Sequence, residues 1–174
     1  MLATTLLMAL NGSAQADQKC DSDKPETTPT SRFQVNAKEG TVLDTQARLT
    51  WKICAEGMIY LNGRCTGNAE FTWDYAAKNF DDKANGWRLP SIDELKSIVE
   101  KRCTEPAINL QVFPNTQPLS FWSASSDAGD PDYAYNIYFG RGLVGNYLKI
   151  NSFYVRLVKG EQWHDDSETP VKNK

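Results

Sequence analysis

The chain has 174 residues, of which 40% are hydrophobic and 24% are charged, and this length suits one globular domain with tails. Its formal net charge is -3, so a nucleic-acid partner is not expected, because a phosphate backbone requires a basic surplus or a basic stripe. The single histidine, His164, lies in the C-terminal tail. A Ser-His-Asp or Cys-His catalytic set inside the domain is therefore excluded.

The N-terminal residues have the features of a signal peptide. Residues 1–16 contain an apolar run from Leu2 to Leu10, carry no charge and end in the small-residue motif AQA, which suits cleavage before Asp17. We therefore expect a secreted or periplasmic protein. No later segment approaches the ~20 apolar residues of a transmembrane helix, and no transmembrane segment is expected.

The rest of the chain divides by composition into three parts. Residues 17–31 are polar and rich in Pro and Thr, and we expect an extended N-terminal arm held only by Cys20. Residues 161–174 lack a periodic apolar pattern and are expected to fray. The ordered domain is therefore expected at residues 32–160.

All four cysteines follow the expected cleavage point, and an even count in an exported protein indicates two disulfides. Four cysteines allow three pairings. Cys54 and Cys65 flank a polar segment with an Asn-Gly turn signal, so we expect them to pair. This leaves Cys20 to join the arm to Cys103. A four-cysteine zinc site would require close pairs of cysteines, and this chain has no such pair.

The domain opens with a predicted hairpin and a predicted helix. Two β-prone runs, residues 41–43 and 49–53, flank a turn at residues 44–47. Thr72 can cap the helix that follows, and the Asn-Gly pair at residues 85–86 is its expected stop. Residues at helical spacing would form its apolar face: Trp73, Ala76, Ala77 and Phe80.

A second helix is predicted within GWRLPSIDELKSIVEKRC, residues 86–103. Ser91 can cap it, Glu94 completes a capping box, and Pro90 favours an extended residue before the cap. We expect the helix to end at Cys103. Its apolar stripe comprises Ile92, Leu95, Ile98 and Val99, and the residues expected to face solvent are Asp93, Glu94, Lys96 and Glu100.

The four residues before this helix are interpreted as structural. We expect Trp87 and Leu89 to pack beneath the helix, and Arg88 to pair with a carboxylate or a carbonyl group. The alternative is a ligand-facing strip in which Trp87 stacks on a sugar ring.

From Phe121 onward the pattern has a period of two, which is typical of strands. The segments are FWSAS, YAYNIYF, LVGNYLKI and SFYVRLV, and in the last of them Phe153, Val155 and Leu157 share one face. A hairpin, two helices and a run of antiparallel strands predict an α+β domain, in which two helices flank a twisted, mainly antiparallel sheet.

Tyrosines concentrate in this strand region, and strand alternation requires some of them to face outward. Tyr133 and Tyr135, with Asn146 and the basic residues Arg141 and Lys149, are our candidate ligand-binding residues. An amphipathic surface of this kind suits protein and sugar interfaces. The alternative is ordinary sheet packing with hydroxyl groups at the rim.

Further residues are assigned to the same region. Asn136 is expected beside the exposed tyrosines, and Arg156 and Lys159 are expected to extend a local basic face with Arg141 and Lys149.

The segment SSDAGDPDY places Asp127, Asp130 and Asp132 in a tight loop, where oxygen ligands would suit calcium rather than a soft metal. The alternative is a surface turn rich in Asp, Gly and Pro. The loop lacks the ligand spacing of an EF-hand, and no cofactor other than calcium is considered.

Several separated motifs occur in a fixed order along the domain: GTVLDTQARLTW, GWRLPSIDEL, PAINLQVFPNT, FWSAS and FYVRLVKG. Through them, residues 40–160 resemble the Lcl C-terminal domain family, exported proteins named after the C-terminal domain of a bacterial collagen-like adhesin. That family is similar in fold to C-type lectin-like domains and to formylglycine-generating sulfatase-modifying enzymes, whose Arg-Leu-Pro-Thr segment looks like residues 88–95 here. The resemblance implies a C-type-lectin-like architecture with an irregular region that carries any binding site.

The same resemblance implies adhesion or ligand binding, because the best-studied relative attaches to sulfated polysaccharides. We therefore expect a non-catalytic binding or adhesion module that recognises a glycan or a surface protein. A sugar binder would show outward Tyr or Trp side chains beside amides in a shallow groove.

Two alternatives remain open. A structural or interaction subunit of a cell-envelope or pilus-like assembly would show a flat apolar patch of roughly a few hundred Å2 or more. A formylglycine-generating-type enzyme would show a deep pocket with convergent polar groups and an unpaired thiol.

Overall fold

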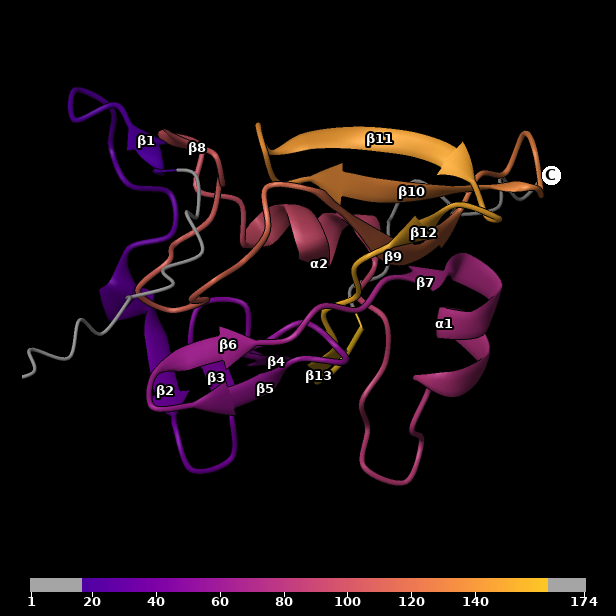
Figure 1. Ribbon diagram of the computed structural model, residues 1–174, viewed down its shortest axis with the longest axis horizontal. Coiled ribbons are helices and arrows are strands. Elements are labelled where there is room, and N and C mark those ends of the chain that lie inside the picture. Colours follow the sequence, from indigo (N-terminus) through magenta and orange to yellow (C-terminus); the bar gives the residue numbers. More distant parts are fainter. Residues whose placement is uncertain (1–16, 163–174) are drawn as a thin grey trace, which may run out of the picture.

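The computed structural model describes residues 17–162, which fold into short strands and two short α-helices (Figure 1). The helices are α1 (Trp73–Asn79) and α2 (Ile92–Ser97), and a 3-10 turn covers Thr30–Arg32. None of these helices is long and apolar enough to cross a membrane. The signal-peptide prediction for residues 1–16 and most of the tail prediction lie outside the described residues.

The strands of the described residues form two larger sheets and three ribbons, all with antiparallel neighbours. The larger sheet has the order β13-β4-β3-β2 and comprises β2 (Phe33–Asn36), β3 (Thr41–Asp44), β4 (Leu49–Lys52) and β13 (Val158–Lys159). The next has the order β11-β10-β9 and comprises β9 (Ser120–Ser126), β10 (Tyr133–Tyr138) and β11 (Leu143–Leu148). The ribbons pair β1 (Lys19–Cys20) with β8 (Cys103–Thr104), β5 (Ile59–Leu61) with β6 (Arg64–Thr66), and β7 (Phe71–Thr72) with β12 (Ser152–Phe153).

The two helices occupy different positions relative to the sheets (Figure 1). Helix α2 packs on β9 and β10, and its buried Leu95, with Ile98 just after the helix, joins a core cluster that also contains Trp51 of β4. Helix α1 lies at one end of the molecule beside β7. The α+β class and the antiparallel pairing are confirmed. The single sheet with two flanking helices is not formed, because the apolar stripe of α2 is covered from both sides and the strands divide among separate sheets.

The segment 153–158 passes between two hydrophobic clusters. Phe153, Val155 and Leu157 pack in the smaller cluster, as their predicted common face requires, and Tyr154 and Val158 pack in the larger one. Because both sides of this segment are covered, it does not run as one exposed-edge strand. It divides instead between β12 and β13, which belong to different sheets.

Arg156 lies within the larger core rather than on the surface. Its guanidinium donates hydrogen bonds to the backbone oxygens of Lys52 (2.9 Å) and Ile53 and to Thr116 Oγ1 (2.8 Å), and it stacks over the ring of Phe113. Burial lowers the pKa of Arg156 to about 9, which leaves the group charged at neutral pH. The prediction that Arg156 contributes to a basic face is wrong, because carbonyl and hydroxyl acceptors hold it inside.

The predicted start of α2 is confirmed in detail. Ser91 Oγ accepts a hydrogen bond from the Glu94 backbone N–H (3.2 Å), and a Glu94 carboxylate oxygen accepts from the Ser91 N–H (2.8 Å). Arg88 donates to both Glu94 carboxylate oxygens, at 2.7 and 2.8 Å, which confirms its predicted carboxylate partner. The prediction that Glu94 faces solvent is wrong: the residue is fully buried, since these donors replace its water.

Helix α2 ends at Ser97, well before the predicted end at Cys103, which lies in β8. Between these points the buried carboxylate of Glu100 accepts hydrogen bonds from the backbone N–H groups of Thr27 (3.0 Å) and Thr28 (2.7 Å). The chain leaves the helical path here and turns this carboxylate toward the arm. Glu100, like Glu94, was expected in solvent and is instead inside.

Helix α1 starts where predicted, because Thr72 Oγ1 accepts from the Tyr75 N–H. It ends at Asn79 rather than at the predicted Asn-Gly stop. The ring of Phe80 packs against Phe71 at a centroid distance of 4.9 Å, and residues 82–85 form a separate turn. Packing of Phe80 therefore ends the helix early.

Both predicted disulfides, Cys20–Cys103 and Cys54–Cys65, are present. The arm is not held by Cys20 alone, as was predicted from its composition. Gln18 Nε2 donates to the backbone oxygens of Pro106 and Ile108, both at 2.7 Å, and Glu100 holds the arm further along. The arm is polar because its contacts are hydrogen bonds, and its polarity did not prevent it from packing on the domain.

Trp87 was expected in the core but is only half-buried. The ammonium groups of Lys52 and Lys159 each lie 5.0 Å from the centre of its ring. Leu89 is buried as predicted. In the lead-in to α2, Leu89 thus packs in the core, whereas Trp87 is partly exposed to solvent.

Candidate binding surface

The β10–β11 hairpin brings together part of the predicted binding set. In its antiparallel register Tyr135 lies opposite Asn146, and Tyr133 lies opposite Leu148. Directly opposed residues share one face of a sheet, so Tyr133, Tyr135 and Asn146 lie on the same face. Both tyrosines are half-buried and Asn146 is exposed, so the hairpin places Tyr135 directly beside an exposed amide.

The two predicted basic residues lie at opposite ends of this hairpin. Arg141 is exposed in the turn before β11, whereas Lys149 follows the end of β11. The six residues of β11 lie between them, and at ~3.4 Å per residue this separates the two positions by roughly 20 Å. The structure therefore does not combine Arg141 and Lys149 in one site.

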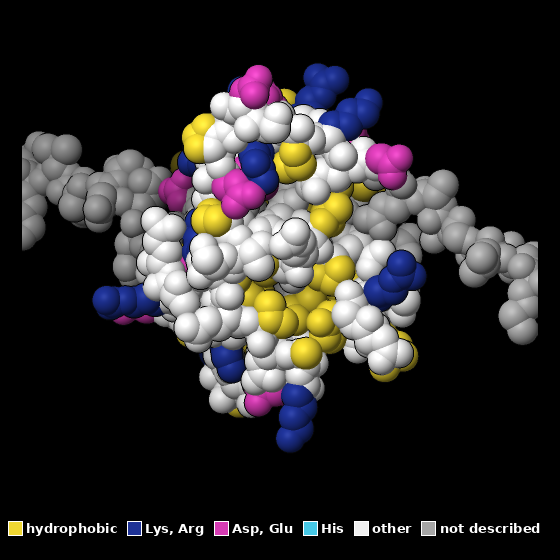
Figure 2. Space-filling view, turned by 90° about the vertical axis from the view of Figure 1, so that its left-hand side faces the viewer, with side chains coloured by type: hydrophobic (Ala, Val, Ile, Leu, Met, Phe, Trp, Pro, Cys, Tyr) yellow, Lys and Arg dark blue, Asp and Glu magenta, His cyan; other side chains and the backbone are white. Residues whose placement is uncertain are grey.

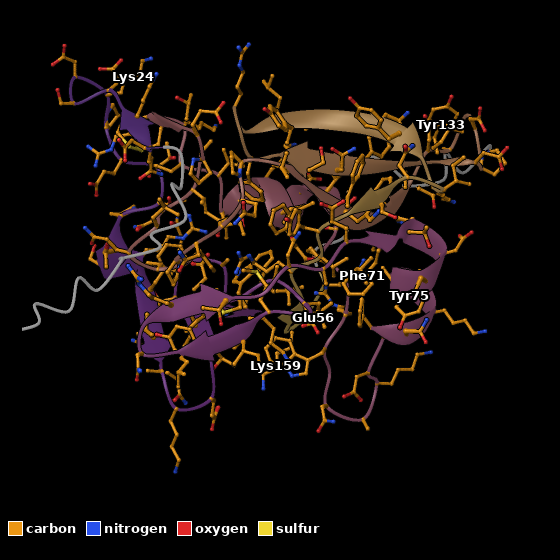
Figure 3. All side chains as sticks on the ribbon, in the orientation of Figure 1. Lys24, Glu56, Phe71, Tyr75, Tyr133 and Lys159 are labelled. Carbon is orange, nitrogen blue, oxygen red and sulfur yellow. A yellow bond between two sulfur atoms is a disulfide. The ribbon has the colours of Figure 1, made fainter. Side chains whose placement is uncertain are left out.

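Lys149 already has contacts within the protein. Its ammonium group donates to the Pro131 backbone oxygen at 2.7 Å and lies 4.2 Å from the centre of the Trp73 ring. These contacts join α1 to the loop before β10. Lys159 lies far from Tyr133, as Figure 3 shows, and contacts Trp87 instead. The predicted basic face is not formed.

The three calcium candidates do not converge on one site either. Asp127 accepts hydrogen bonds from the Gly129 N–H (2.8 Å) and from Asn146 Nδ2 (2.5 Å). Asp130 accepts from the Asp132 N–H at 3.1 Å. Within residues 17–162 no three His, Cys, Asp or Glu side chains converge in a way that could hold a metal ion. The loop is built as a hydrogen-bonded turn that also fixes Asn146.

Asn136 was expected beside the exposed tyrosines and is instead fully buried. It lies opposite Gly145, and a Cβ atom at residue 145 would approach the Asn136 side-chain oxygen to 2.8 Å. Neither polar atom of this amide has a hydrogen-bond partner among the described residues. Gly145 is therefore required at this position, because any side chain would collide with the buried amide.

Sequence reasoning missed the most exposed apolar feature of the hairpin. Five large hydrophobic residues of β11 and the turn after it have exposed fractions between 37% and 79%: Leu143, Val144, Tyr147, Leu148 and Ile150. The segment from Gly142 to Leu148 also carries no charge. The sequence signal for this feature was the absence of charged residues in LVGNYL. The alternating pattern of a strand does not by itself show whether that strand is exposed or covered.

The backbone of β11 is open along one side. Strand β11 stands at the end of its sheet and pairs with β10 only. The Lys149 N–H donates to the Asp132 oxygen, and since bonding direction alternates along an antiparallel strand, the backbone groups of Val144, Asn146 and Leu148 point away from β10. These groups form an unpaired edge beside exposed apolar side chains.

Another face of the molecule has a different surface. Figure 2 shows the face that carries the arm and the end of the four-stranded sheet, where hydrophobic side chains gather in the middle and charged side chains stand around them. Charges of both signs thus border this apolar area. Strand β11 differs, because its exposed apolar residues lie in a run without charge, with Leu143 and Tyr147 on one face and Val144 and Leu148 on the other.

Two cavities among the described residues are small. One of about 280 Å3 lies between the turn at residues 37–40 and the start of the Cys54–Cys65 loop. Another, of about 220 Å3, has an apolar lining that includes Trp73, Leu89 and Ala124. Both volumes fall below the ~300–1,000 Å3 that is usual for ligand pockets.

Comparison with known proteins identifies the domain. No curated protein and no solved structure matched the chain. The family model described as Lcl C-terminal domain matches residues 40–159, which cover most of the chain and contain the capped helix, the Cys54–Cys65 loop and the β10–β11 hairpin. The chain therefore belongs to the Lcl C-terminal domain family.

Proposed function

We propose that the protein is an exported, non-catalytic binding module that contacts a protein partner through strand β11. The observation that carries this proposal is the uncharged, apolar and backbone-open edge formed by Leu143–Leu148. Proteins usually protect such an edge with charge, proline or a covering segment, because it pairs readily with another strand. Among the described residues no strand pairs with the outer edge of β11, and we propose that a separate protein does so.

The energetics favour a protein partner at this edge. Burial of one large apolar side chain contributes about 1.5–3 kcal/mol, and β11 offers several on adjacent positions. A partner strand would also satisfy the outward backbone groups of Val144 and Asn146. Strand addition uses both contributions, with main-chain hydrogen bonds for affinity and alternate side chains for selectivity.

Export is supported by the two disulfides, because disulfides persist mainly in oxidising compartments. The same pairing weakens the alternative of a formylglycine-generating-type enzyme. Such an enzyme would use two reactive cysteines, and all four cysteines of this chain are joined in disulfides. We therefore favour a non-catalytic role.

A photo-crosslinking experiment tests the proposal at single-residue resolution. A photo-reactive phenylalanine analogue replaces Val144 of β11 in the exporting cell, and the matched control carries it at Val35 of the other sheet edge. The two valines are equally exposed, at 50% and 48%. The expected result is a discrete protein adduct at residue 144 that is absent at residue 35. Equal labelling at both positions, or none at residue 144, contradicts the proposal.

A second candidate, a glycan ligand, is favoured by the pairing of Tyr135 with the exposed amide of Asn146. An aromatic ring beside an amide suits sugar recognition, because the ring stacks while the amide donates and accepts hydrogen bonds. Binding of the protein to a panel of neutral and sulfated glycans tests it. Loss of that binding in Tyr135→Ala, with retention in Tyr75→Ala, would favour the glycan; absence of binding to the whole panel rules it out.

A further inference from the structure

We propose that the partner of β11 is β11 of a second copy of this chain. The two strands would pair antiparallel about a two-fold axis at Asn146 and join two three-stranded sheets into one. This inference rests on the proposed use of β11 as a contact surface and adds the identity of the partner. It follows from the backbone direction, the side-chain register and the charge pattern of β11.

Backbone direction restricts the register. The outward groups belong to Val144, Asn146 and Leu148, and a hydrogen-bonded pair can form only between residues of this set. The Leu148 oxygen already accepts from the Asn151 N–H at 3.0 Å, so Leu148 contributes chiefly its own N–H. Centring the axis on Asn146 pairs Asn146 with its counterpart and directs the Leu148 N–H to Val144 of the other copy. An axis at Gly145 would also satisfy backbone direction, but it would place Val144 opposite Asn146 of the other copy and lose the apolar pair of Val144 with Leu148.

The side chains suit this register. Val144 faces Leu148 of the second copy, so an exposed branched side chain covers another apolar side chain on the same face. On the other face Gly145 lies opposite Tyr147 of the second copy. The ring of Tyr147 in the same chain lies 3.0 Å from where a Cβ of Gly145 would stand, so the missing side chain at residue 145 lets this half-exposed ring lie low over its own strand, beside the second copy. A bulkier residue at 145 would prevent this as well as displace Asn136.

The charge pattern makes a second copy acceptable at this edge. The paired segment from Gly142 to Leu148 contains no ionisable side chain. In the proposed register Lys149 faces Leu143 of the other copy, and Arg141 faces Asn151, so like charges are never directly opposite. A strand of six residues is a small contact, and the expected association is weak. Covalent trapping is therefore more sensitive than chromatography.

Cysteine cross-linking tests the register. A residue on the axis meets its own counterpart, with Cα atoms ~5.5 Å apart in a hydrogen-bonded pair, which lies within the range a disulfide requires. Asn146→Cys in the full chain should therefore form a disulfide-linked dimer under mild oxidation. The single variant Val144→Cys faces Leu148 and should not, whereas Val144→Cys combined with Leu148→Cys should. Val35→Cys, on the β2 edge, controls for random collision.

We expect Asn146→Cys to cross-link roughly tenfold faster than Val144→Cys or Val35→Cys, because pairing raises the effective concentration of the facing thiols. Equal rates for the three single variants overturn the inference, as does a monomeric Asn146→Cys. Mass mapping of Cys20–Cys103 and Cys54–Cys65 verifies the fold of each variant. Should Asn146→Cys misfold, the pair Val144→Cys and Leu148→Cys decides by the same criterion.

The result also separates this inference from the proposed function. If Asn146→Cys stays monomeric while the photo-reactive residue at 144 labels a different protein, the second copy is wrong and β11 remains a contact surface. If residue 144 labels nothing and no cysteine variant cross-links, both are wrong. If residue 144 labels this same chain and Asn146→Cys cross-links, both are supported.

Discussion

Helix α2 and strand β11 distribute charge and apolar surface in opposite ways. Around α2 the carboxylates of Glu94 and Glu100 are buried, although both belong to the residue type that most strongly prefers water. Along β11 the side chains of Leu143 and Val144 are exposed, although both prefer the interior. The comparison shows that partners decide burial more than residue type does: the carboxylates have donors on all sides, and the apolar strand has no cover among residues 17–162.

The buried charges near α2 are structural for the same reason. Glu94 joins the lead-in to the helix, since it accepts from Arg88 of the lead-in and from the Ser91 N–H at the helix start. Glu100 joins the domain to the arm. Mutations of these buried charges should lower the stability of the fold and leave association intact. Mutations in β11 should weaken association and leave stability nearly unchanged.

The largest expected effect is that of Glu94→Ala. It leaves Arg88 partly buried without its carboxylate and removes half of the capping box, and breaking a buried pair of this kind costs about 3–5 kcal/mol. Urea denaturation measures the loss. The control is Asp93→Ala on the same helix, whose carboxylate makes only an exposed pair with Lys96. Similar unfolding free energies for the two variants would show that Glu94 is not the structural charge described here.

The next effect is that of Glu100→Gln, and it depends on pH. Burial alone would raise the pKa of Glu100, but hydrogen bonds from the Thr27 and Thr28 backbones and the Thr28 hydroxyl outweigh it and lower the pKa below the ordinary value. A lowered carboxyl pKa stabilises the folded state above the pKa of the unfolded chain, and this contribution is lost as pH falls through the folded pKa. At neutral pH we expect a loss of about 1–3 kcal/mol.

The pH dependence distinguishes charge from shape at Glu100. The difference in unfolding free energy between the parent protein and Glu100→Gln should shrink as the solution is acidified below the ordinary glutamate pKa. Urea denaturation at neutral and at acid pH gives that difference. A difference that stays constant with pH would mean that the carboxylate charge contributes nothing to holding the arm.

A smaller effect is expected from Ser91→Ala. The Ser91 hydroxyl accepts from the Glu94 N–H, and loss of an N-cap of this type costs about 1 kcal/mol. Thermal and urea denaturation both measure it. The matched comparison is Ser97→Ala at the other end of α2, where the hydroxyl only donates to the Glu94 carbonyl oxygen and should matter less. If Ser91→Ala had the same unfolding free energy as the parent protein, the Ser91 cap would not stabilise the start of α2.

The smallest effect on stability is expected from Val144→Lys. Half of this side chain is exposed and its backbone edge is unpaired, so substitution should change the unfolding free energy by no more than about 0.5 kcal/mol. Urea denaturation beside Val35→Lys provides the check. A loss of several kcal/mol at Val144 would show that the residue supports the fold, and the contrast with α2 would then fail.

The sequence predicted those features whose signals are local. The capping box at Ser91, the cap at Thr72, the hairpin of β3 and β4 and both disulfides follow from short spacings or from the cysteine count, and the structure confirms them. Features that depend on distant partners were not predictable in this way. Glu100 looks like a solvent-facing helical residue until the arm, more than seventy positions earlier, supplies its donors.

The candidate site was predicted only in part for a similar reason. Strand pairing placed Tyr135 beside Asn146, but alternation does not tell which face of a sheet is covered. Asn136 and Arg156, which were expected at the surface, are therefore buried, and the ammonium group of Lys149 lies over the Trp73 ring. The exposed edge of β11 was not predicted. Whether a strand is central or terminal is set by sheet order, which no local pattern in LVGNYL reveals.

The most direct test of the central claim is sedimentation velocity of the parent protein, Val144→Lys and Val35→Lys across a range of concentrations. We expect the parent and Val35→Lys to show the same concentration-dependent increase in sedimentation coefficient, and Val144→Lys to remain monomeric, because a charge on the paired edge of β11 opposes strand pairing. If all three sediment alike, or if Val35→Lys alone loses association, β11 does not pair with a second copy of this chain.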